Sequence, residues 1–171
     1  AAHAVLAYLG YRRGWQFGYE ALEDPEVRSI LDGALEEALQ GIVIRYGAEE
    51  RWLRDHVADL LVRFGNRALQ DRIVRLARDP LRKLAPEDRL VGAARVAETT
   101  GRTPGCLAWG IAAALRYDEP TDPSAVALRQ RIASSGVAST LEGLCAIRPE
   151  EPLGRAVLER YAALGEQGMW T

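Results

Sequence analysis

The sequence contains two histidines, and only one of them stands in a setting that suits acid–base chemistry. His56 lies among Arg54, Asp55 and Asp59, which predicts a solvated surface position. His3 lies in an apolar segment at the start of the chain. It has two interpretations: an imidazole packed in a helix and bonded to backbone, or a proton donor and acceptor at a cleft. The residues around it leave both interpretations open.

A cluster of basic residues follows later in the chain. Its first part repeats at three-residue intervals along a predicted helix, and its second part surrounds the break at Asp79-Pro80. Its members are Arg72, Arg75, Arg78, Arg82, Lys83 and Arg89. The carboxylates between them favour a solvated, ion-paired face, whereas guanidinium and ammonium groups beside a loop also suit a phosphate or carboxylate. A nucleic-acid patch is a third interpretation, weakened by the interleaved acids and the lack of stacking aromatics.

Several motifs that bind cofactors or metals are missing from the sequence. There is no GxGxxG after a strand and no GxxxxGK[ST], so nothing in the chain is predicted to cradle a diphosphate. There is no HExxH, no Cys/His cluster with metal spacing and no GxSxG elbow. We therefore predict neither cofactor-binding residues nor metal ligands in this chain.

Composition narrows the class of protein further. The 171 residues are 48% apolar and 27% charged, which is typical of a globular domain, and the net charge of −2 gives no general attraction to nucleic acid or anionic membrane. No apolar run approaches membrane-spanning length. Cys106 and Cys145 are far apart and are predicted to be reduced thiols in a cytoplasmic protein. The chain opens directly in a helical pattern, so we expect it to continue an element that begins upstream.

Apolar spacings of three and four residues predict helices throughout, with no alternation of period two. The expected fold is all-α, a bundle of about eight to ten helices in a single domain over residues 1–171. Asp24-Pro25 predicts one clear helix start, and Gly10 and Gly47 predict helix ends. The predicted helices cover residues 1–10, 24–46, 48–64, 69–77, 86–99, 106–117, 124–134, 139–145 and 151–164.

An ordered series of short segments resembles the C-terminal domain of the mannitol-1-phosphate 5-dehydrogenases, within the polyol-specific long-chain dehydrogenases. The series covers most of residues 3–135, and its most specific part surrounds Asp79-Pro80. It comprises His3 with Tyr8-Leu9-Gly10, Gly33-Ala34, Arg45-Tyr46-Gly47, Arg63-Phe64, Asp79-Pro80-Leu81-Arg82-Lys83-Leu84 with Asp88-Arg89-Leu90, and Gly110-Ile111-Ala112.

The resemblance implies an NAD-dependent oxidoreductase that interconverts mannitol 1-phosphate and fructose 6-phosphate without a metal. Such enzymes pair an N-terminal Rossmann domain, which binds most of the NAD, with a helical substrate domain like this one. Of their Lys-x4-Asn-x2-His motif only the histidine is present, as His3, which is the predicted catalytic residue. Arg75, Lys83 and Arg82 are the predicted substrate-binding residues. Without the lysine and the cofactor domain, the chain alone is expected to be inactive.

Two departures keep other functions open. Asn66 is followed by Arg67 where the family has proline, and the segment 11–20 is distinctive. A mannitol 2-dehydrogenase or uronate reductase domain is one alternative. A stand-alone helical interaction module that has lost the chemistry is a second, and a helical nucleic-acid binder is a third.

Overall fold

The computed structural model describes residues 1–165, which form ten α-helices and two short 3-10 helices. Within these residues there is no β-strand, only an isolated antiparallel bridge between Phe17 and Arg72. The predicted all-α class is therefore confirmed. Residues 166–171 of the predicted domain lie outside the described residues. The helices are α1 (Ala2–Arg12), α2 (Gly18–Glu23), α3 (Pro25–Tyr46), α4 (Glu50–Phe64), η1 (Arg67–Leu69), α5 (Ile73–Ala77), α6 (Pro80–Lys83), α7 (Val91–Ala97), η2 (Glu98–Thr100), α8 (Gly105–Leu115), α9 (Pro123–Cys145) and α10 (Pro152–Ala163).

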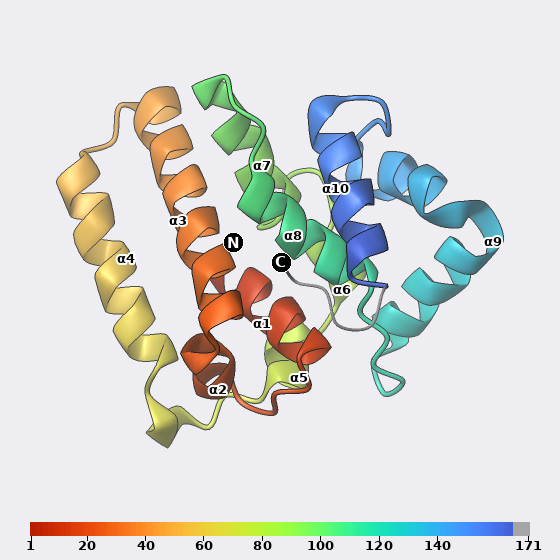
Figure 1. Ribbon diagram of the computed structural model, residues 1–171, viewed down its shortest axis with the longest axis horizontal. Coiled ribbons are helices and arrows are strands. Elements are labelled where there is room, and N and C mark those ends of the chain that lie inside the picture. The colour runs from red at the N-terminus through yellow and green to blue at the C-terminus, as the bar shows by residue number, and fades with distance from the viewer. Residues whose placement is uncertain (166–171) are drawn as a thin grey trace.

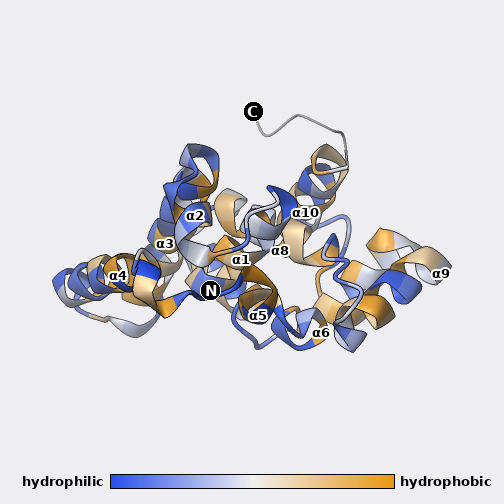
Figure 2. Cartoon of the chain, turned by 90° about the horizontal axis from the view of Figure 1, so that it is seen from below, coloured by the Kyte–Doolittle hydropathy of each residue, from blue (hydrophilic) through white to orange (hydrophobic). Residues whose placement is uncertain are grey.

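Helices α1 and α8 form the centre of the molecule, with α4 and α9 at its opposite ends (Figures 1 and 2). Every residue from Ala4 to Gly10 of α1 is buried, and so is every residue from Gly110 to Leu115 of α8. Tyr8 and Tyr117 are fully buried in this core, with their ring centroids 5.3 Å apart. A helix that is apolar on all sides is typical of a buried position, and the strongly apolar run over residues 106–117 predicts such a central helix. In the described part of the chain, no helix is both long and apolar enough to cross a membrane.

Three helices begin with the same capping motif, an aspartate at the N-cap followed by a proline. Asp24 accepts hydrogen bonds from the backbone nitrogens of Glu26 and Val27 at the start of α3. Asp79 and Asp122 cap α6 and α9 in the same way, each followed by a proline at the first helical position. The carboxylate satisfies backbone donors that have no partner within the helix, and proline lacks such a donor. The helix predicted over residues 24–46 is confirmed, as is its end at Gly47.

Gly10 does not end the first helix as predicted, because α1 continues to Arg12. Gly10 is buried at a close helix crossing. A Cβ atom placed there would lie 2.7 Å from Cβ of Ala21 and 2.9 Å from Cδ1 of Ile73. The glycine therefore permits close packing against α2 and α5 instead of a chain reversal.

Other predicted boundaries are also corrected by the structure. The helix predicted over residues 69–77 is only α5, and the one predicted over residues 86–99 begins at Val91 as α7. The segment labelled α9 is interrupted at Gly136, whose backbone angles of φ 79° and ψ 160° are not helical, so two helices meet there, as predicted for residues 124–134 and 139–145. The apolar spacing over residues 48–64 predicts an inward-facing Trp52, but this residue is 61% exposed, because α4 lies at the edge and buries only Leu53 and Phe64.

Candidate substrate site at the start of helix α1

His3 lies in the first turn of α1, next to the end of α4. Its imidazole ring rests on the ring of Phe64, with centroids 3.8 Å apart and a tilt of 33°. The opposite side of His3 remains exposed. Because α1 is fixed along its length in the core, the backbone that carries His3 is rigid. The structure therefore presents an imidazole with one supported face and one accessible face.

The surroundings of His3 favour its neutral form. Partial burial is the main cause of a pKa below the ordinary value of 6.5. The positive charges of Arg63 and Arg89 act in the same direction, and the carboxylate of Asp71 opposes them. A neutral imidazole near pH 7 has both a donor and an acceptor nitrogen, as acid–base or hydrogen-bonding work on a hydroxyl requires.

Lys83 lies at the end of α6 and is only 4% exposed. Its ammonium donates hydrogen bonds to the backbone oxygens of Leu76, at 2.5 Å, and Arg78, at 2.6 Å, and lies 5.5 Å from the ring centroid of Tyr8. Burial, with the nearby charges of Arg89 and Arg82, lowers the pKa of Lys83 to about 8. Lys83 therefore joins the end of α5 to α6 and has little free access to a ligand.

The two predicted arginines take different positions. Arg75 is 78% exposed and pairs with Asp71 at 3.6 Å. Arg82 pairs with Asp79 at 3.0 Å and with Asp88 at 3.7 Å. The predicted helical ladder through Arg72, Arg75 and Arg78 does not form, since α5 spans only Ile73–Ala77 and the outer two arginines flank it.

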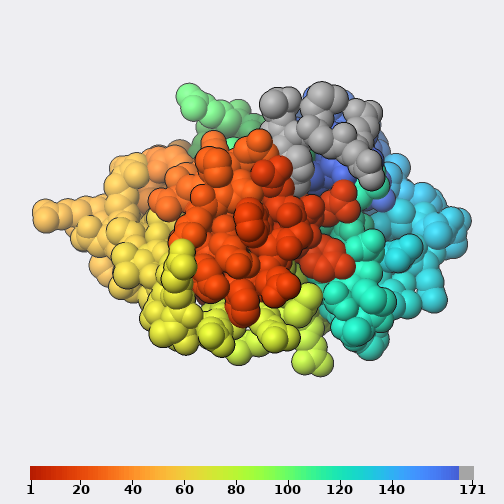
Figure 3. Space-filling model, turned by 60° about the horizontal axis from the view of Figure 1, so that its bottom comes forward, coloured from red at the N-terminus to blue at the C-terminus, as the bar shows by residue number. Residues whose placement is uncertain are grey.

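Charged neighbours link some of the predicted site residues to one another. Asp71 acts on His3 and pairs with Arg75. Arg89 acts on both His3 and Lys83. Figure 3 shows the red-orange surface of the first two helices bordered by the yellow surface of the segment around residues 60–80.

Two side chains near this region were missed as contributors by sequence reasoning. Phe64 supports the ring of His3, and Tyr8 covers Lys83. Both occur in segments that carry the family resemblance, but a contact between residues 3 and 64 has no signal in helical spacing. His56, predicted to be a surface residue, is exposed on α4 and stacks on Trp52 with ring centroids 5.7 Å apart.

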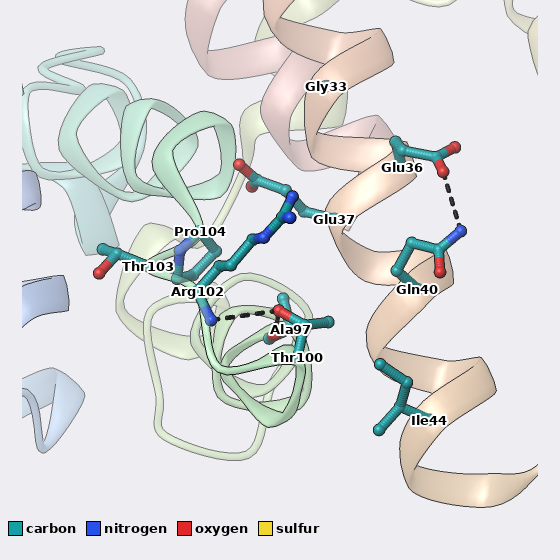
Figure 4. A pocket seen from close by; sticks show the side chains of 10 residues that line it. All are labelled: Gly33, Glu36, Glu37, Gln40, Ile44, Ala97, Thr100, Arg102, Thr103 and Pro104. Carbon is teal, nitrogen blue, oxygen red and sulfur yellow. Dashed lines mark hydrogen bonds between the residues drawn. The ribbon is translucent and has the colours of Figure 1, made fainter.

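A cavity of about 640 Å³ lies elsewhere, between α3 and the segment that leads from η2 into α8. Figure 4 shows Glu37 of α3 beside Arg102, and the amide of Gln40 hydrogen-bonded to Glu36 farther from Arg102. Glu37 accepts hydrogen bonds at 2.8 Å from the backbone nitrogens of Cys106 and Leu107, so it caps α8. Glu37 is therefore engaged in capping α8. None of the predicted site residues lines this cavity.

Metal and dinucleotide sites each need a particular grouping of side chains or backbone. Over residues 1–165, no group of three or more His, Cys, Asp or Glu side chains could hold a metal ion. A dinucleotide site needs a glycine-rich turn between a strand and a helix, and the described residues contain no strand.

Comparison with known proteins identifies the group to which this helical arrangement belongs. Residues 1–143 match the mannitol dehydrogenase C-terminal domain. The chain belongs to this family. It is 41% identical over 158 residues to a mannitol-1-phosphate 5-dehydrogenase of Bacillus velezensis, and 40% identical over 158 residues to that of Bacillus subtilis. Each alignment covers 92% of this chain but only 41% of the relative.

A solved structure shows the same fold over nearly the whole chain. The Pseudomonas fluorescens mannitol 2-dehydrogenase, in a ternary complex with NAD and D-mannitol, aligns with a TM-score of 0.73 and 20% identity. The alignment covers 98% of this chain and 36% of that protein. Mannitol dehydrogenase C-terminal domains thus share the all-helical architecture described above, and this chain spans well under half the length of the relatives it matches.

Proposed function

We propose that this chain is the substrate-binding domain of an NAD-dependent oxidoreductase that interconverts mannitol 1-phosphate and fructose 6-phosphate. The observation that carries the proposal is the identity of about 40% to mannitol-1-phosphate 5-dehydrogenases over 92% of the chain. A cytoplasmic location belongs to the same proposal. In it, residues 1–171 form one helical domain that works beside a Rossmann domain, which holds the NAD.

In this proposal His3 acts on the oxygen of the reacting carbon. Its neutral imidazole donates a hydrogen bond to that oxygen and steadies the negative charge that develops as the hydroxyl loses its proton. Phe64 fixes the ring plane, and the burial of α1 fixes the backbone. Arg75, Lys83 and Arg82 remain the predicted substrate-binding residues, with Lys83 acting through the backbone it holds as well as through its charge.

A chimeric enzyme tests the proposal. The N-terminal part of the Bacillus subtilis relative is joined directly before Ala1, and NADH formation is measured with mannitol 1-phosphate. We expect turnover by the chimera and none by the 171-residue chain alone. His3→Ala should lower kcat about 100- to 1000-fold, which is typical for loss of one donor to a developing oxyanion.

His56→Ala provides the matched control, because that imidazole is exposed on α4, where it stacks on Trp52. It should leave the kinetic constants of the chimera unchanged. Equal effects of the two alanine variants would contradict the role of His3. A folded chimera that binds NAD but turns over neither mannitol 1-phosphate nor mannitol would contradict the enzymatic proposal and favour a stand-alone module.

A further inference from the structure

The cations near His3 differ in how many of their donors are already used. Lys83 gives two hydrogen bonds to backbone oxygens and is nearly inaccessible. Arg82 is held between Asp79 and Asp88. Arg75 faces bulk water, where screening weakens its hold on an anion. None of these three predicted substrate ligands offers a sheltered guanidinium or ammonium group with free donors.

Arg89, which was not among the predicted site residues, has free donors on a side chain that is 46% exposed, against 78% for Arg75. Its backbone nitrogen and its Nε both donate to Oδ1 of Asp88, at 2.6 and 3.1 Å. This fixes the root of the side chain in the turn before α7. Its two terminal nitrogens make no hydrogen bond or ion pair with any residue in the range 1–165 that the structure describes. A guanidinium with an anchored Nε and two free terminal nitrogens is suited to bind two oxygens of one anion.

The position of Arg89 gives such an anion space. Arg89 lines a groove of about 560 Å³ between α3 and α7, and Ala1 lines the same groove two residues before His3. Apolar side chains such as Ala38 and Ile42 form part of its wall. Glu87 and Asp88 also line it, but Asp88 is engaged by Arg82 and Arg89.

The charge around Arg89 supports anion binding. Arg89 contributes to the lowered pKa values of His3 and Lys83. The side chains of His3 on α1 and Lys83 on α6 therefore lie within electrostatic reach of this guanidinium. A bound phosphate would relieve that unfavourable concentration of positive charge.

We propose that Arg89 binds the phosphate of the substrate, and that it makes the site selective for a sugar phosphate over the free sugar. The identity of this ligand rests on the function proposed above. The remainder of the sugar then extends from Arg89 toward His3 at the start of α1. Arg89 is thus a specificity-determining residue, and the imidazole is the group that meets the reacting oxygen.

A titration of the 171-residue chain tests the binding step without any turnover. The imidazole resonances of His3 are followed by NMR while inorganic phosphate, fructose 6-phosphate or fructose is added. Both phosphates should shift the His3 resonances saturably and raise its pKa, and fructose should not. The other charged groups that act on this pKa in the 171-residue chain, Asp71, Arg63 and the Ala1 amino group, are the same in every titration.

Two arginine variants show whether the effect belongs to Arg89. Arg89→Gln should abolish the phosphate-dependent shift of His3. Arg45→Gln, which removes a cation from the α3 side of the same groove, should leave it intact. Equal shifts by fructose, no shift with either phosphate, or a shift that persists in Arg89→Gln would each overturn the proposal.

The chimera separates failure of this inference from failure of the proposed function. In an active chimera, Arg89→Gln should reduce kcat/KM for mannitol 1-phosphate roughly 10- to 100-fold, as expected for lost charge-assisted hydrogen bonds, and change that for mannitol little. Equal losses on both substrates would overturn the role of Arg89 and leave the function standing. Phosphate binding that depends on Arg89, in a chimera without turnover, would overturn the proposed function and leave the role of Arg89 standing.

Discussion

Helices α8 and α4 are both recognisable from the apolar residues in their sequences, but they have opposite relations to the candidate site. Helix α8 is enclosed, and its residues Leu107 and Ile111 are fully buried. Helix α4 lies at the edge, and its Trp52 and Val62 are exposed. His3 lies at the boundary, since α1 packs on α8 and the His3 ring rests on Phe64 at the end of α4. Stability and site chemistry should therefore respond to different helices.

The largest expected effect follows from removing core volume in α8. Ile111→Ala leaves a cavity at a position with no exposed surface, and should lower the free energy of unfolding by about 2–5 kcal/mol. Val62→Ala on α4, where the side chain is 74% exposed, should change it by no more than about 0.5 kcal/mol. Urea denaturation of both variants measures the contrast. Comparable losses would show that α4 is as much a part of the core as α8.

A pair of glycines sharpens the same comparison. Gly110→Ala adds a methyl group 2.7 Å from Cγ2 of Val5, where α1 and α8 approach closely, and should cost about 1–3 kcal/mol through overpacking. Gly65→Ala, at the end of α4, places the methyl group at an ordinary 3.5 Å from Leu22 with φ at −77°. It should be neutral or stabilise the fold by up to about 1 kcal/mol. Thermal unfolding followed by circular dichroism distinguishes them, and a destabilised Gly65→Ala would contradict the loose packing assigned to α4.

The sequence predicted best where local chemistry decides the structure. The start of α3 at Asp24-Pro25 and the burial of α8 follow from one cap and one apolar pattern. It failed where tertiary contacts decide. Gly10 resembles a helix end in isolation, but it is a packing contact with Ala21 and Ile73. Trp52 has the spacing of a core residue, but no helix covers that face of α4 in the described structure.

The candidate site shows the same division between features set by local sequence and features set by tertiary contacts. The identity of His3 and of the basic segment could be predicted from their resemblance to a family. The state of each cation could not, because it depends on long-range partners. Lys83 is engaged by the oxygens of Leu76 and Arg78, and the free donors of Arg89 become visible only once Asp88 is seen to hold its Nε. A list of basic residues therefore does not show which of them can receive a ligand.

The smallest expected effect is electrostatic, and it tests whether α4 contributes to the site at all. Arg63, on α4, lowers the pKa of His3, and Asp71, outside α4, raises it. Arg63→Gln should therefore raise the pKa of His3 and Asp71→Asn should lower it, as measured by NMR titration of the imidazole, with His3→Gln to assign the signal.

Since the pKa of His3 is lower in the folded state than its ordinary 6.5, His3 contributes stability above about pH 6.5 that is lost as the pH falls through the folded value. Arg63→Gln should lessen that loss in acid and Asp71→Asn should increase it. If only the Asp71 variant changes the titration, then α4 supplies the site with a supporting ring and no charge, and the boundary position of His3 is steric alone.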